Sequence, residues 1–150
     1  MPKSVANLKA IVGISYRCAL TDDGSVYWWG PMAALGFSAS PVKVDGVSGA
    51  ISLSCGLASC AVTEKGKIEC WGSNSGGVLG DGTEISRLTP APVLGLTGVV
   101  EVACGGHHTC ARLEDGSVQC WGENKWGTLG DGTKVSRAVP GPVPGLSSVQ

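Results

Sequence analysis

This sequence of 150 residues contains few aromatic residues, few charged residues and few long segments without glycine or proline. No stretch between successive glycines or prolines exceeds ten residues, which leaves little room for ordinary helices of about eleven to twelve residues. Apolar segments also stay far below the roughly 18 residues that cross a bilayer. Residues 1–16 lack the apolar core and cleavage pattern of a signal peptide. We therefore expect an all-β chain that does not contact a membrane.

An excess of charge of one sign is lacking too. The chain has 11 basic and 12 acidic residues, a net charge of −1, and no cluster of lysines and arginines. Such a cluster is what neutralises a phosphate backbone, so nucleic acid is not an expected partner. Glycine, in contrast, is abundant at 24 residues, and this indicates many tight turns.

One segment of the sequence occurs three times. Residues 60–72 (CAVTEKGKIECWG) recur at 110–122 (CARLEDGSVQCWG), and an earlier copy stands at 18–30 (CALTDDGSVYWWG). Copies two and three continue with Leu-Gly-Asp-Gly-Thr, a turn that the first copy lacks. Arg87 and Arg137 recur after this turn and are expected to brace it. Repetition at this period predicts one domain, 1–150, of three repeats at about 4–50, 51–100 and 101–150.

Each copy contains the pattern of an antiparallel hairpin, because a turn ending in glycine separates two short apolar runs. The implied register sets Cys60 opposite Cys70 and Cys110 opposite Cys120, so both pairs are candidate disulfides. In the first copy it sets Cys18 opposite Trp28. Cross-strand disulfides would favour an extracytoplasmic location.

Three cysteines are left unpaired by this reasoning, namely Cys18, Cys55 and Cys104. We align Cys55 and Cys104 with each other and with Val12 of the first copy, and expect small buried apolar side chains there. No cysteine spacing matches a zinc site.

The run VACGGHHTCA at 102–111, followed by Asp-Gly-Ser-Val, Cys-Trp-Gly and Leu-Gly-Asp-Gly-Thr, resembles the repeat of the regulator of chromosome condensation family. In the first copy, residues 13–18 (GISYRC) stand for Gly-Gly-His-His-Thr-Cys. The Cys-Trp-Gly spelling is similar to the bacterial branch. The resemblance implies a β-propeller of four-stranded antiparallel blades, commonly seven per ring, whose faces and rim bind proteins.

Function varies widely within this family, which includes exchange factors for a small GTPase, a bacterial β-lactamase inhibitor and a plant ultraviolet photoreceptor. The photoreceptor's Gly-Trp-Arg-His-Thr motif is absent, since residues 106–109 read Gly-His-His-Thr. The wedge insertion of the exchange factors is not recognisable in these short loops. The expected function is a protein-binding module.

Three blades do not close a ring, because propellers contain four to eight. The open flanks of the first and last blades would expose apolar surface. One solution is a second copy of the chain, joined head to tail as a homodimer with a six-bladed ring. The other is a longer, seven-bladed chain that supplies the missing repeats. The sequence leaves both open.

Tryptophan occupies one shared position of the repeat, and a large aromatic there predicts packing between blades. These core residues are Trp29, Trp71 and Trp121. Aromatic residues specific to one copy are better candidates for contacts with a partner. The candidate binding residues are Trp126, Lys125, His107, Tyr27 and Trp28, although Trp28 is favoured as a packing substitute for the missing cysteine.

An enzyme with a site in the central channel is the alternative function. It would need convergent acids, histidines or metal ligands, whereas the expected inner strands offer mainly Ile, Val, Ala, Ser, Cys and Gly. His107 and His108 are adjacent on a strand, so their side chains point to opposite faces and do not chelate one metal. We expect one of them to bond a backbone carbonyl inside the blade. No catalytic residue, metal or cofactor is predicted.

Overall fold

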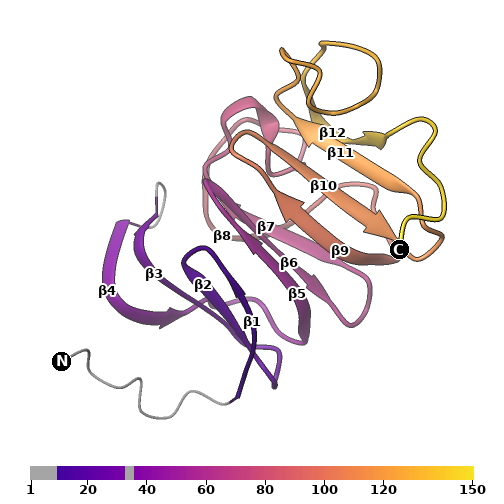
Figure 1. Ribbon diagram of the computed structural model, residues 1–150. Coiled ribbons are helices and arrows are strands. Elements are labelled where there is room, and N and C mark those ends of the chain that lie inside the picture. Colours follow the sequence, from indigo (N-terminus) through magenta and orange to yellow (C-terminus); the bar gives the residue numbers. More distant parts are fainter. Residues whose placement is uncertain (1–9, 33–35) are drawn as a thin grey trace.

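The computed structural model describes residues 10–32 and 36–150. Within them the chain forms three four-stranded antiparallel sheets, each made of consecutive strands (Figure 1). The prediction of four-stranded blades in an all-β chain is confirmed. None of the described segments forms a helix able to cross a membrane. Residues 4–9 of the first repeat lie outside the described residues.

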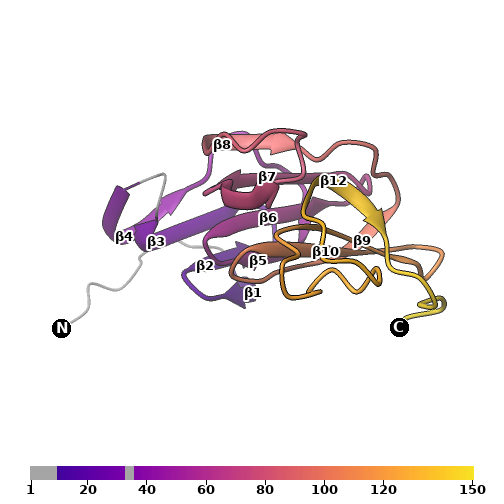
Figure 2. The same ribbon diagram turned by 90° about the horizontal axis from the view of Figure 1, so that it is seen from above.

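The three blades follow one another along the chain, and Figure 2 shows them side by side. The first contains β1 (Ile11–Ser15), β2 (Cys18–Thr21), β3 (Val26–Met32) and β4 (Gly36–Lys43). The second contains β5 (Ala50–Cys55), β6 (Ala58–Thr63), β7 (Ile68–Gly72) and β8 (Arg87–Pro92), with the 3-10 turn η1 (Ser75–Gly77) after β7. The third contains β9 (Val99–Cys104), β10 (His108–Leu113), β11 (Val118–Gly122) and β12 (Arg137–Pro142).

The central hairpin of each blade has the register that the sequence predicts. Cys60 pairs with Cys70 across β6 and β7, and Cys18 pairs with Trp28 across β2 and β3. The turn of the second blade ends at Gly66, whose φ of 68° is a left-handed conformation that glycine adopts without steric cost. The turn residue therefore fixes which side chains of the hairpin face each other.

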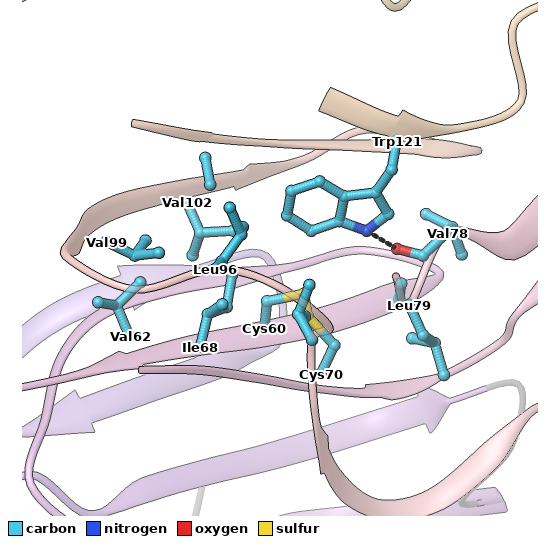
Figure 3. Packing of buried hydrophobic residues seen from close by; sticks show 13 residues of the cluster. Cys60, Val62, Ile68, Cys70, Val78, Leu79, Leu96, Val99, Val102 and Trp121 are labelled. Carbon is cyan, nitrogen blue, oxygen red and sulfur yellow. Dashed lines mark hydrogen bonds between the residues drawn. A yellow bond between two sulfur atoms is a disulfide. The ribbon is translucent and has the colours of Figure 1, made fainter. Parts of the chain in front are cut away.

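The apolar core lies between blades, and Figure 3 shows the part between the second and third. The second blade contributes Val62 and Ile68, and the third contributes Val99 and Trp121. The core between the first and second blades contains Trp71 at the position of Trp121. The tryptophans of the second and third repeats thus pack against the blade that precedes them, as expected for core residues.

Trp29 departs from this prediction. It occupies the same repeat position as Trp71 and Trp121, which are both fully buried, yet it is only half-buried. The reason is that the described chain contains no blade before the first, so nothing covers that face.

The same open face includes two isoleucines of β1. Ile11 and Ile14 are 43% and 74% exposed, whereas their counterparts in the third blade, Val99 and Val102, are 1% and 5% exposed. The first blade therefore presents an apolar surface of the kind that blade packing covers elsewhere in this chain.

The first hairpin of the chain is shorter than the sequence comparison predicts. Ser15 pairs with Cys18, so residues 13–18 form a strand and a tight turn instead of the longer loop seen at 104–109. This register places Tyr16, and not Val12, at the position of Cys55 and Cys104.

The cysteines form one more bond than the sequence predicts. Disulfides join Cys60 to Cys70 and Cys110 to Cys120 within their hairpins, each with a Cα–Cα distance of 4.1 Å. The prediction that Cys18 and Cys55 are unpaired is wrong, because a disulfide joins them with a Cα–Cα distance of 6.3 Å. Cys18 faces the second blade and has Trp28 as its hairpin neighbour, so its partner comes from β5. This bond links the first two blades covalently.

Candidate functional site

A pocket of about 270 Å³ opens at one end of the third blade. The loop between β9 and β10 and the loop after β11 form it. The backbone N–H of Glu123 donates to the carbonyl of His107 at 2.8 Å, which ties the two loops together. The lining residues are Gly106, His107, His108, Glu123, Lys125, Trp126 and Thr128.

Trp126 is the most exposed aromatic side chain at this pocket, with 79% of its surface accessible. Its counterpart in the second blade is Gly76, where an added Cβ would lie 3.2 Å from the Cβ of Glu123. The equivalent loop of the second blade therefore packs closely on the third, whereas the third blade presents an indole to solvent. Exposed indoles of this kind are enriched among residues that dominate protein interfaces.

Charged groups stand beside the indole. Lys125 Nζ lies 3.0 Å from Glu123 Oε1, and both side chains are partly exposed. A pair in this position contributes little to stability, so both groups are available to a partner. The pocket thus combines an apolar surface with a cation and an anion.

The two histidines differ from the prediction that one lies inside the blade. His107 is exposed and His108 is half-buried at the pocket. The interior position belongs to Thr109, which is fully buried and donates its hydroxyl to the carbonyl of Val78 at 3.0 Å. The described residues contain no group of three or more His, Cys, Asp or Glu side chains that would hold a metal ion.

A buried asparagine holds the loop that carries Trp126. Asn124 is fully buried, and its Oδ1 accepts the backbone N–H of Leu129 at 3.0 Å. Its Nδ2 donates to the carbonyls of Thr133 and Val135 at 3.2 Å each and to Asp131 Oδ1 at 3.1 Å. One side chain therefore replaces the backbone pairing that this irregular segment lacks.

Asp131 completes the frame of this loop. Its carboxylate accepts the backbone N–H and the hydroxyl of Thr133, and these bonds, with Asn124 and Arg137, hold its pKa below the usual value. Arg137 Nη1 lies 3.2 Å from Asp131 Oδ2, and Arg87 forms the same ion pair with Asp81 in the second blade. The prediction that these arginines brace the Gly-Asp-Gly-Thr turn is confirmed.

Sequence reasoning missed the asparagines of this frame. Asn74 makes the same set of bonds in the second blade. Both asparagines stand two residues after the glycine of Trp-Gly, whereas the first copy has Met32 there and also lacks the Gly-Asp-Gly-Thr turn. The asparagine and the Gly-Asp-Gly-Thr turn occur together in the second and third copies and are both missing from the first. This co-occurrence is the sequence signal that could have identified the asparagines.

The structure brings three of the five predicted binding residues together, namely Trp126, Lys125 and His107. Tyr27 and Trp28 belong to the first blade and lie apart from the pocket. Trp28 is buried in the core between the first two blades at 8% exposure, so it packs, as the sequence favoured. Tyr27 is half-buried opposite Ala19.

The profile of the Regulator of chromosome condensation (RCC1) repeat matches residues 65–112 and 115–150, and a second profile of this repeat matches 99–127. The human E3 ubiquitin-protein ligase HERC2 is 37% identical over an alignment of 114 residues, and the match covers 68% of this chain and 2% of HERC2. The chain thus spans a small part of this relative.

Solved structures with the same fold include human WBSCR16, with a TM-score of 0.76 and 26% identity over 93% of this chain and 39% of that one. Yeast RCC1 (Prp20) in its complex with Kap60 has a TM-score of 0.69 and 24% identity, covering 83% of this chain and 32% of that one. These likenesses identify the three sheets as blades of the propeller type.

Proposed function

The chain belongs to the regulator of chromosome condensation repeat family, and on this premise we propose that it is a module that binds another protein through the third blade. The observation that carries the proposal is the exposed indole of Trp126 beside Lys125 and Glu123. Loops on a rigid β-scaffold are where such folds carry binding residues. A propeller of the same fold, yeast RCC1 (Prp20), is bound to Kap60.

Binding accounts for these residues better than catalysis in a central channel. The inner strands β1, β5 and β9 carry a single carboxylate, Glu101, among the described residues. Glu101 Oε2 accepts a hydrogen bond from Arg112 Nε at 3.0 Å. An acid already paired with arginine, with no second carboxylate and no histidine or lysine on these strands, is a poor start for general acid–base chemistry.

Trp126→Ala is expected to weaken binding to peptides selected from a displayed random library by about thirtyfold, the effect of losing an interface hot spot of about 2 kcal/mol. Binding would be followed by titration of immobilised protein with each selected peptide. The thermal midpoint should stay unchanged because the indole is exposed. Ile85→Ala is the control, since Ile85 is 68% exposed and lies in the second blade, outside the pocket. Equal affinity of wild type and Trp126→Ala would overturn the proposal.

The ring is completed, in our proposal, by a second copy of the chain that covers the open faces. The face of the third blade that looks away from the second includes Cys110 and Val118, which are half-buried, whereas their counterparts Cys60 and Ile68 are at most 2% exposed. The open face of the first blade, with Ile11 and Ile14, is apolar as well. Two chains joined head to tail would pair these faces twice.

Light scattering at micromolar concentration is expected to give twice the 15.1 kDa mass of the chain. Ile14→Glu should shift the mass toward the monomer, because it places a charge on the face to be buried. A monomeric mass for the wild type would reject the homodimer and support the second candidate, in which further repeats of a longer chain complete the ring.

The disulfides support a further proposal, that the chain works outside reducing compartments.

A further inference from the structure

Three cysteines meet between the second and third blades. Cys104, at the end of β9, is a free thiol that packs against the core containing the Cys60–Cys70 disulfide. Its backbone N–H donates to Ser54 Oγ at 2.9 Å, and its thiol donates to the carbonyl of Ser54 at 3.5 Å. Ser54 pairs with Cys60 across β5 and β6. The free thiol is therefore held beside one end of the disulfide.

The same arrangement occurs one blade earlier. The backbone N–H of Cys55 donates to Ser15 Oγ at 2.9 Å, and Ser15 pairs with Cys18 across β1 and β2. Here the two cysteines are joined, and the bond crosses from one blade to the next. The blade interface thus accommodates a disulfide at the position where Cys104 stands opposite Cys60.

The two blade interfaces differ in the residue that stands opposite Cys18 or Cys60 within its hairpin. Cys18 has Trp28 as its hairpin neighbour and so bonds across the interface, whereas Cys60 has Cys70 and bonds within its hairpin. We propose that the second interface exchanges between two disulfide isomers, a hairpin isomer with Cys60–Cys70 and a cross-blade isomer with Cys60–Cys104.

The exchange needs no external oxidant or reductant. The Cys104 thiolate attacks the Sγ of Cys60, the Cys60–Cys70 bond breaks, and Cys70 leaves as a thiolate that takes up the proton lost by Cys104. One disulfide and one thiol are present before and after. The consequence is mechanical, because the cross-blade isomer ties the third blade, which carries the Trp126 pocket, covalently to the second.

Burial raises the pKa of the Cys104 thiol to about 11. Only the thiolate attacks a disulfide, so exchange starting from the hairpin isomer should be slow at neutral pH. Its rate should rise about tenfold for each pH unit until the pH approaches that pKa.

The Cys70→Ser variant, refolded with oxidised glutathione as the electron acceptor, is expected to form the cross-blade disulfide Cys60–Cys104. After acid quench, alkylation without reduction and digestion, mass mapping should show a peptide joining Cys60 to Cys104. Alkylation of both Cys60 and Cys104 in a folded Cys70→Ser protein would overturn the proposal.

Cys120→Ser is the matched control. Cys110 holds the repeat position of Cys60, but the described chain has no following blade to offer a cysteine, so Cys110 should be alkylated in this variant. If Cys70→Ser does not fold, the wild-type protein provides the test. It is held at about pH 9, near the ordinary pKa of a cysteine thiol. A growing fraction with alkylated Cys70 supports exchange, and alkylation confined to Cys104 overturns it.

Discussion

Replacement of Trp121 by alanine is expected to lower the free energy of unfolding by about 3–5 kcal/mol, the usual loss for a large aromatic removed from a core. Its indole is fully buried between the second and third blades, and its Nε1 donates to the carbonyl of Val78 at 2.9 Å (Figure 3). The variant would create a cavity and remove one of the two donors to that carbonyl, leaving the hydroxyl of Thr109 as its partner. Urea denaturation, followed by the fluorescence of the remaining tryptophans, measures the loss.

Trp29→Ala is the matched control for this prediction. Trp29 has the same repeat position but is half-buried on the open face of the first blade, so its loss should be less than half as large. Equal losses for Trp29 and Trp121 would contradict the view that the tryptophan acts by packing on the preceding blade. Equality at high protein concentration alone would instead indicate that a second copy covers Trp29.

Local sequence determined what could be predicted of this fold. The glycine of each hairpin turn sets the register, and the register places Cys60 opposite Cys70 and Cys18 opposite Trp28. These features depend on residues close together in the chain. The repeat then extends them to all three blades.

Contacts between blades could not be predicted in the same way. The Cys18–Cys55 disulfide and the exposure of Trp29 both depend on which side of a blade faces a neighbour. Repeat alignment treats the three copies as equivalent, whereas the first has an uncovered face and a shorter hairpin. Lys125 and Trp126 are neighbours in the sequence, but only the fold shows that a second loop brings His107 to the same pocket.

The second large effect concerns Asn74, whose polar atoms hold the loop between β7 and β8. Asn74→Ala is expected to lower the free energy of unfolding by about 2–4 kcal/mol, because a buried group that loses its partner costs about 1–3 kcal/mol. The backbone N–H of Leu79 loses its acceptor at 2.9 Å, and the carbonyls of Thr83 and Ile85 lose their donor at 2.9 and 3.1 Å.

Asn124→Ala separates the local effect from the effect on the blade interface. Asn124 makes the same bonds as Asn74, but the two loops have different surroundings. The loop of Asn74 includes η1 and the buried Val78, which pack against the third blade. The loop of Asn124 lines the open pocket. Groups freed near solvent regain hydrogen bonds to water, so Asn124→Ala should cost about half as much as Asn74→Ala. It should also weaken peptide binding at Trp126, which Asn74→Ala should do only by unfolding the chain. A larger loss of stability for Asn124→Ala than for Asn74→Ala in urea would show that η1 does not support the interface.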